Sequence, residues 1–207
     1  MKQPKFLYFD LGNVLLNFDH KLACRQMGEA AGVSADRVWE VVFGSGLELR
    51  YEAGEFDNQG FFDQFCRETQ TQPDISCLLR AGCEIFDVNH AIVPIVTQLA
   101  MARYRMGILS NTNAAHWALV DDGRYGLLKQ GFSVHCLSFE VRAVKPGLAI
   151  YQTAARLAGV APAEIFYVDD VAANVEGAIK AGFDAVQYTS APQLAADLRR
   201  RGVRCNY

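Results

Sequence analysis

The chain lacks the cysteine and histidine patterns that build metal sites or disulfide frameworks. Its 207 residues include 6 cysteines and 4 histidines, but they form no CxxC pair and no histidine cluster at metal-ligand spacing. Zinc binding and a disulfide-stabilised fold are therefore disfavoured. We expect the cysteines to be small core residues in a reducing compartment, the cytoplasm.

Long hydrophobic runs and a surplus of basic residues are missing as well. No apolar run approaches the ~18 residues of a transmembrane helix, and the N-terminus shows no signal-peptide hydrophobic region. Lys and Arg number 20 against 23 for Asp and Glu. The dense basic run Arg199–Arg201 is interpreted as the solvated end of a terminal helix. We expect no membrane and no nucleic acid as partner; the sequence leaves monomer or homodimer open.

Short apolar runs alternate with helical patterns through most of the chain. Strands are predicted at 5–9, 104–109, 134–139, 164–168 and 184–188, and helices at 91–102, 113–120, 147–158, 172–181 and 191–201. Such alternation is typical of βαβ units. We predict an α/β fold with a doubly wound, Rossmann-like parallel sheet, in which right-handed crossovers bring the carboxyl ends of the strands to one edge.

Residues 17–87 interrupt this alternation. They show one helical pattern after another, at 20–31, 35–43, 47–53, 58–69 and 74–81. A helical block inserted after the first strand is best explained as a small cap over the edge of the sheet. We predict a core domain of residues 1–16 and 88–207 and a helical cap domain of residues 17–87.

Asp10 is the most informative residue. It follows the apolar run Phe6–Phe9 and precedes Leu11-Gly12, which places a carboxylate at the edge where parallel α/β sheets bind ligands. Such an aspartate can be a metal ligand, a general base or a nucleophile. Aspartate is also common as a plain turn residue after strands.

Two later segments carry groups suited to an anion. Ser110 and Asn111 stand between a strand and a helix, where backbone N–H groups can cradle an anion, although plain helix capping is the better explanation when they are taken alone. Lys145 precedes Pro146, which restricts Lys145 to extended backbone. A lysine fixed there can neutralise a phosphate, or it can simply be exposed.

Asp169 and Asp170 directly follow another buried strand. Two adjacent carboxylates are costly there unless a cation meets them. Mg²⁺ is the natural cation, because it is bound by few carboxylates together with water and substrate oxygens. Asn174 lies one turn into the next helix and could orient Lys145.

Four motifs in this order resemble those of the haloacid dehalogenase-like hydrolase superfamily, over nearly the whole chain: Asp10, Ser110, Lys145 and Asp169-Asp170. The segments 10–14, 51–56 and 168–177 look like the branch that contains bacterial sugar-1-phosphate phosphatases. The phosphatase domain of soluble epoxide hydrolases is a more distant relative. The helical insert is similar to the type 1 cap of that family.

The resemblance implies a phosphatase mechanism on a small phosphorylated metabolite. Asp10 would attack phosphorus and carry an aspartyl-phosphate, and the catalytic residues would be Asp10, Ser110 and Lys145. Substrate binding would use Ser110, Lys145, Asn111 and Glu52. Mg²⁺ would be bound by Asp10, Gly12 and Asp170. Asp169 and Asn174 would lie in the outer shell of the metal.

Gly12 departs from the family pattern, which has an aspartate at this position. In the family, the backbone carbonyl of this residue binds Mg²⁺, and glycine retains that carbonyl. The lost side chain would protonate the leaving alcohol and later activate water, help that is typically worth about 10²–10⁴-fold. The chain would then recruit another acid or act on esters that leave easily, such as a sugar 1-phosphate.

Asp19, His20 and Glu52 are the candidate substitute acids. Asp19 is better explained as the cap of the helix that begins near His20. Glu52 and Glu55 would face the site if the family geometry holds, although solvation on the surface explains them about equally well. His116 is interpreted as a packing or surface residue.

Three functions stay open at this stage. A Mg²⁺-dependent phosphatase is the leading interpretation. A 2-haloacid dehalogenase needs neither a leaving-group acid nor a metal, so Gly12 allows it and the Asp169-Asp170 pair argues against it. A weakly active binding or regulatory protein would keep the fold, but the intact acidic and basic motifs argue against it.

Overall fold

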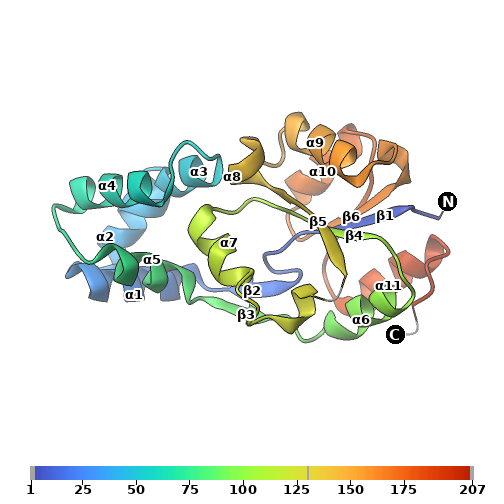
Figure 1. Ribbon diagram of the computed structural model, residues 1–207, viewed down its shortest axis with the longest axis horizontal. Coiled ribbons are helices and arrows are strands. Elements are labelled where there is room, and N and C mark those ends of the chain that lie inside the picture. The colour runs from blue at the N-terminus through green and yellow to red at the C-terminus, as the bar shows by residue number, and fades with distance from the viewer. Residues whose placement is uncertain (1–2, 130, 206–207) are drawn as a thin grey trace.

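The predicted parallel sheet is the centre of the molecule. The computed structural model describes residues 3–129 and 131–205. Five parallel strands lie in the order β5-β4-β1-β6-β7 (Figure 1). They are β1 (Phe6–Phe9), β4 (Met106–Ser110), β5 (Phe132–Leu137), β6 (Ile165–Asp169) and β7 (Asp184–Gln187). The predicted α/β fold is confirmed, with all five strands close to their predicted bounds.

Helices cover both faces of the sheet, as a doubly wound fold requires. Helices α6 (Val93–Met101) and α11 (Ala191–Arg200) pack on one face, and α9 (Leu148–Ala158) and α10 (Ala172–Lys180) on the other. Residues of β1 alternate between the two apolar clusters: Leu7 and Phe9 belong to the first, Phe6 and Tyr8 to the second. Burial on both faces explains why this run is apolar throughout.

The segment between two short strands, β2 (Leu16–Phe18) and β3 (Phe86–Val88), forms the cap. Its helices are α1 (His20–Ala31), α2 (Ala35–Trp39), the π-helical turn η1 (Glu40–Gly44), α3 (Leu47–Glu52), α4 (Asn58–Thr69) and α5 (Ile75–Cys83). They share an apolar cluster of their own. Strands β2 and β3 pair antiparallel. The sequence pattern does not reveal this ladder, and both predicted domain boundaries fall inside it.

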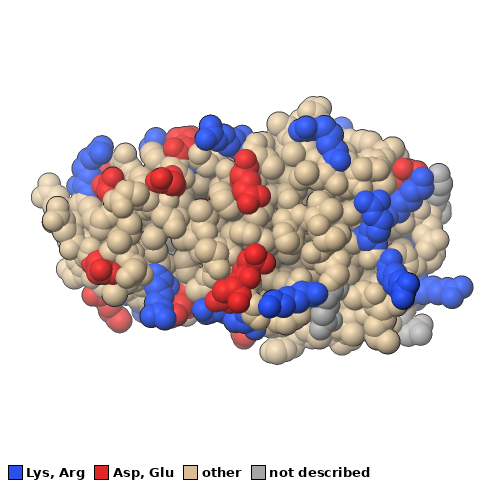
Figure 2. All heavy atoms as spheres, viewed as in Figure 1, with Lys and Arg blue, Asp and Glu red and all other residues tan. Residues whose placement is uncertain are grey.

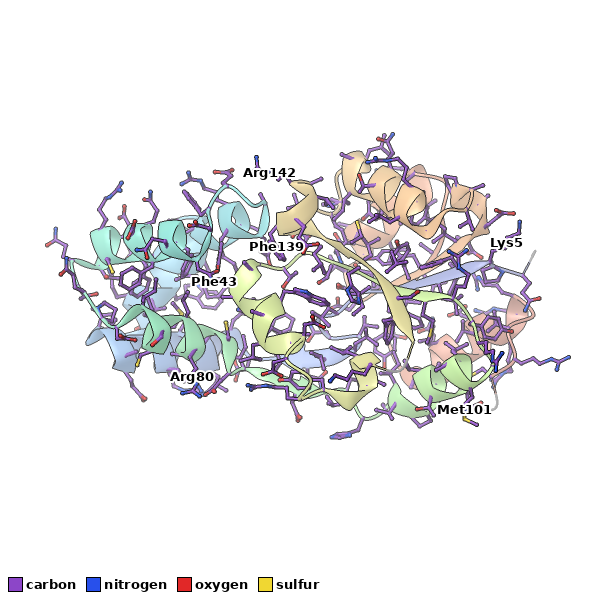
Figure 3. The ribbon with its side chains drawn as sticks, in the orientation of Figure 1. Lys5, Phe43, Arg80, Met101, Phe139 and Arg142 are labelled. Carbon is purple, nitrogen blue, oxygen red and sulfur yellow. The ribbon has the colours of Figure 1, made fainter. Side chains whose placement is uncertain are left out.

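The cap meets the core where α5 packs against α7 (Ala114–Val120) and where α3 approaches α8 (Ser138–Val141), the helix that carries Phe139 (Figure 3). Gly54, which follows α3, has a φ of +73° and comes so close that an added Cβ would lie 2.3 Å from the Phe139 carbonyl oxygen. Any larger residue would push the two backbones apart. The remaining helical pieces of the core are the short turns η2 (Gly126–Lys129) and η3 (Pro162–Glu164).

Two expectations from composition need correction. Cys24, Cys83, Cys136 and Cys205 are buried as expected, but Cys66 is half-buried and Cys77 exposed; all six are free. Arg201 is not solvated: it is 5% exposed, and its Nη2 donates to Asp184 Oδ1 at 2.6 Å. The guanidinium also lies over the Phe166 ring, so the end of α11 is tied to the sheet.

Surface charge is mixed. Acidic and basic side chains intersperse over the face in Figure 2, with apolar and neutral polar atoms between them. Among the residues that the structure describes, no helix combines the length and the apolar character needed to cross a membrane.

Gly107 in β4 provides a test of the sheet packing. An added Cβ would lie 2.6 Å from Tyr8 Cε1 and 2.7 Å from the Val134 carbonyl oxygen. Overpacking of this kind should lower the free energy of unfolding of Gly107→Ala by about 1–3 kcal/mol in urea titrations. Gly126→Ala is the control, because an added Cβ there meets no atom within 4 Å; it should change stability by less than about 0.5 kcal/mol. Equal stability of the two variants would contradict the prediction.

Candidate active site

Parallel strand ends bring the predicted site residues together. Asp10 follows β1, Ser110 ends β4 and Asp169 ends β6, and β1 pairs with both of the other strands. A cavity of about 300 Å³ opens at this edge. Its lining includes Asp10, Gly12, Asn13, Ser110, Asn111, Lys145, Asp170 and Asn174 from the core, and Phe18, His20, Glu48 and Glu52 from the linker and the cap.

Lys145 is the buried centre of the site. Its side chain is 1% exposed, with Nζ 2.9 Å from Asp10 Oδ1 and 2.7 Å from Asp169 Oδ2. The ammonium also donates to the Tyr167 hydroxyl at 3.0 Å and to the carbonyl oxygen of residue 109 at 3.2 Å. Burial opposes the charged form, yet the two carboxylates outweigh it and hold the pKa of Lys145 above its ordinary value. A fixed cation therefore lies beside Asp10.

Asp10 keeps one carboxylate oxygen available. Its Oδ1 accepts from the Leu11 N–H at 2.7 Å and contacts Lys145, whereas no hydrogen bond recorded for the described residues reaches Oδ2. Burial raises the pKa of Asp10 to about 7, against the lowering effect of Lys145. A cation bound beside this carboxyl group would favour its charged form.

Asp169 holds Lys145, and both of its carboxylate oxygens already accept hydrogen bonds. Tyr167 and Lys145 donate to its Oδ2, and the Val171 N–H donates to Oδ1 at 2.8 Å. The amide of Asn174 donates to both carboxylate oxygens at 3.1 Å. Asn174 thus orients Asp169, whereas the sequence suggested that it orients Lys145. It acts on the lysine through the carboxylate.

Asp170 supplies the second available carboxylate. Carboxylate oxygens of Asp10, Asp169 and Asp170 lie within 4.8 Å of one another, and Asp170 Oδ2 accepts from the Asn13 amide at 3.0 Å. Because Asp169 is saturated, Asp10 and Asp170 remain for a cation, with the Gly12 carbonyl nearby in the lining. Oxygen donors of this kind fit Mg²⁺.

Ser110 and Asn111 lie beside Lys145, in different roles. Ser110 is buried, and its Oγ donates to the Asn111 carbonyl at 3.1 Å. Asn111 was expected to bind substrate, but its side chain is committed to the backbone of Lys145: Oδ1 accepts from the N–H at 2.8 Å and Nδ2 donates to the carbonyl at 3.1 Å. Asn111 therefore positions the lysine.

The space beside Gly12 is filled by Phe18. A Cβ added at Gly12 would lie 2.7 Å from Phe18 Cε1 and 3.3 Å from Cδ1. The Phe18 ring packs in turn against His20, with centroids 4.7 Å apart. Any side chain at position 12 would compete with this ring for the same space.

The candidate substitute acids are placed very differently. Asp19 caps α1, as expected: its carboxylate accepts from the N–H groups of Lys21 and Leu22. Glu55 is exposed and pairs with Arg50. Glu52 lines the cavity.

Four residues at the cavity or beside Lys145 were missed from the sequence: Asn13, Phe18, Glu48 and Tyr167. Tyr167 had a signal, because it lies two residues before Asp169 on one strand and so shares its face. Glu48 could also have been found, because it lies one helical turn before Glu52 and so shares its face of the helix. Asn13 and Phe18 had no such signal, since their roles depend on chain segments that meet only in the folded state.

The edge of the doubly wound sheet thus carries a carboxylate, a buried lysine and an acidic pair, and a helical cap lies over it. This arrangement is typical of capped α/β hydrolases. The chain belongs to the haloacid dehalogenase-like hydrolases, whose family description matches residues 5–182. The resemblance drawn from the four sequence motifs is confirmed.

Solved structures share this fold. One is a haloacid dehalogenase (HAD) family enzyme of Bacteroides thetaiotaomicron, solved with magnesium and inorganic phosphate. The two sequences are 23% identical, the alignment covers 90% of this chain and 95% of that enzyme, and the TM-score is 0.79. A predicted HAD-like hydrolase of Porphyromonas gingivalis is 22% identical, with 96% and 97% covered and a TM-score of 0.79. An L-2-haloacid dehalogenase of Xanthobacter autotrophicus, with chloropropionic acid covalently bound, is 22% identical, with 97% and 84% covered and a TM-score of 0.64.

The contact between Gly12 and Phe18 can be tested by a double-mutant cycle. Gly12→Ala should lower the free energy of unfolding by about 1–3 kcal/mol, because the new Cβ overlaps the ring. In a Phe18→Ala background this penalty should disappear, a non-additivity expected for residues in contact. Gly44→Ala, whose Cβ would meet no atom closer than 3.8 Å, is the control. Additive effects of the two substitutions would show that the ring does not occupy this space.

Proposed function

We propose that this hydrolase is a Mg²⁺-dependent phosphatase that cleaves a small phosphorylated metabolite through an aspartyl-phosphate on Asp10. One observation carries the proposal: the Asp10 carboxylate contacts the Lys145 ammonium through Oδ1, keeps Oδ2 available and lies within 4.8 Å of the Asp170 carboxylate. A nucleophile, a fixed cation and a second carboxylate for a metal are the groups that phosphoryl transfer needs. The fold relative solved with magnesium and phosphate supports the same chemistry.

Each core residue has a defined task in this proposal. Asp10 attacks phosphorus, while Lys145 and Ser110 hold the phosphoryl oxygens. Asp10, Asp170 and the Gly12 carbonyl would hold Mg²⁺, which supplies positive charge to the phosphoryl group when bound. Asp169 and Asn174 keep the ammonium in place, through the contacts described above.

The cap side of the cavity favours a neutral, hydroxyl-bearing group on the phosphate. Its lining offers the rings of Phe18 and Phe86 and the carboxyl groups of Glu48 and Glu52, which can accept hydroxyl hydrogen bonds. Lys145 is the only lysine or arginine among the described residues that line this cavity. A sugar 1-phosphate fits both this lining and the better leaving group that Gly12 favours.

A second candidate is metal-independent 2-haloacid dehalogenation. The missing side chain at Gly12 favours it, because halide leaves without a proton. Saturation of Asp169 and availability of Asp170 favour the phosphatase, since a dehalogenase has no need of a cation site. A weakly active binding or regulatory protein is the third outcome that the assays below separate.

Asp10→Asn should abolish phosphatase activity. We expect Mg²⁺-dependent release of phosphate from p-nitrophenyl phosphate by the wild type, and a fall of about 10³-fold or more in the variant, because a nucleophile is lost. EDTA should remove the activity and added Mg²⁺ restore it. Asp63→Asn, an exposed residue of α4, is the matched control and should keep full activity.

Two results would refute the phosphatase. Release of halide from 2-chloropropionate without metal would identify a dehalogenase. No activity in either assay, together with retained ligand binding, would identify a binding protein.

A panel of phosphate esters should separate substrate classes. We expect kcat/KM for sugar 1-phosphates to exceed that for simple primary alkyl phosphates and for sugar bisphosphates by about tenfold or more, a difference of about 1.4 kcal/mol in transition-state binding. Equal or better rates on primary alkyl phosphates would rule out the anomeric preference.

A further inference from the structure

The acid that the family carries at position 12 is absent from this protein, which has Gly12 instead. The ring of Phe18 occupies the space that a side chain on Gly12 would enter. The ring is braced by Phe86 at 6.2 Å and His20 at 4.7 Å between centroids. The proton that a leaving alcohol requires must therefore come from another residue that borders the cavity.

Most titratable groups of the cavity lining are unsuited to this task. His116 has Nε2 on the Gly82 carbonyl and Nδ1 on the Asn113 amide, and burial lowers its pKa to about 4. His20 lies between the rings of Phe18 and Phe43, and burial lowers its pKa as well. Both imidazoles are neutral at neutral pH, and a neutral imidazole is a poor acid.

Glu48 and Glu52 remain, and Glu52 is the better placed. Asp10, Asp170 and Lys145 already have roles in the proposed phosphoryl transfer. Glu52 interacts electrostatically with Lys145 and Asp10, whereas Glu48 interacts with Glu52 and lies 3.7 Å from His20 Nε2. Glu52 is thus the cap carboxyl that lies within the field of the nucleophile.

The backbone around Glu52 is fixed to the core on both sides. The preceding residue, Tyr51, accepts a hydrogen bond from the Ala115 N–H at 3.3 Å through its hydroxyl. Two residues after Glu52, Gly54 packs against the carbonyl of Phe139. These two contacts hold the backbone at Glu52 against the core, and fixed placement of this kind favours the role of an acid in a reaction.

We propose that Glu52 donates the proton to the leaving alcohol, in place of the side chain that Gly12 lacks. This inference rests on the proposed phosphatase function. As Asp10 Oδ2 forms its bond to phosphorus, the ester P–O bond breaks and its electron pair goes to the ester oxygen. That oxygen takes the proton of the Glu52 carboxyl and leaves as the neutral alcohol, and Glu52 becomes a carboxylate.

The same carboxylate then serves the second half of the reaction. A water attacks phosphorus, its proton goes to Glu52, and the bond between phosphorus and Asp10 breaks with its electron pair returning to Asp10. Phosphate leaves and Glu52 is again protonated, so the cycle balances.

The electrostatics of the cap support the protonated form. Burial raises the pKa of Glu52 to about 7, with Lys145 lowering it and Asp10 raising it. Burial and the neighbouring Glu52 raise the pKa of Glu48 to about 8. Glu48 lies on the same helix as Glu52; Lys145 and Asp10 act on Glu52 from the core, and His20, His116 and Asp170 line the same cavity. A carboxyl with a pKa near 7 can both give and take a proton near neutral pH.

The test compares two esters whose leaving groups differ in their need for a proton. A sugar 1-phosphate such as glucose 1-phosphate leaves more easily than a simple alkyl ester, but its alkoxide is still far more basic than p-nitrophenolate, so it depends more on a proton donor. Single-turnover release of each alcohol is measured with Mg²⁺ for the wild type, Glu52→Gln, Glu52→Asp and Glu55→Gln. Glu55 is the matched control, because it belongs to the same segment and pairs with Arg50 at the surface.

We expect the ratio of the two rate constants, sugar phosphate over p-nitrophenyl phosphate, to fall about 10²–10⁴-fold in Glu52→Gln. It should stay at the wild-type value in Glu55→Gln. The wild-type rate with the sugar phosphate should fall as pH rises above about 7, because the protonated donor is lost. Glu52→Gln should lack this alkaline limb, and Glu52→Asp should restore it in part. The p-nitrophenyl phosphate rate shows that each variant is folded.

The possible failures are distinguishable. If the wild type is active and Glu52→Gln slows both esters equally, or retains the alkaline limb, Glu52 is not the proton donor and the phosphatase assignment stands. If the wild type releases neither alcohol with Mg²⁺, the proposed function fails and this inference fails with it.

Discussion

The rest of the site depends on one buried interaction, the Lys145 ammonium held between the carboxylates of Asp10 and Asp169. It joins the ends of β1 and β6 to the loop before α9. Removing one partner of a buried ion pair leaves an uncompensated charge, a loss of about 3–5 kcal/mol. Asn111 pins the lysine backbone and Asn174 orients Asp169, so the neighbouring polar groups fix this arrangement rather than compete with it.

The molecule divides its chemistry between core and cap. The core lines one side of the cavity with Asp10 and Asp170, next to strand ends, and with Lys145 from the loop before α9, whereas the linker and the cap add aromatic and carboxyl groups. The contact between Gly54 and Phe139 holds the two parts together beside Glu52. The proposed proton transfer from Glu52 would compensate, from the cap, for the side chain that Gly12 lacks.

The fold alone does not choose between phosphate and halide chemistry. Structures with bound phosphate and with covalently bound chloropropionic acid share it with this chain at similar identities. Function is decided by the site. The phosphatase proposal rests on Asp170, whose carboxylate lies within 4.8 Å of that of Asp10, and Gly12, beside the ring of Phe18, leaves position 12 without an acid.

The sequence by itself determined the sheet, the cap and the strand-end residues Asp10, Ser110 and Asp169, because apolar runs and helical periodicity are local signals. The β2–β3 ladder escaped it, since each strand is three residues long and its partner lies far along the chain. Only the tertiary structure decided that Phe18 fills the space at Gly12, because side-chain contacts between distant segments depend on packing, which no local pattern encodes.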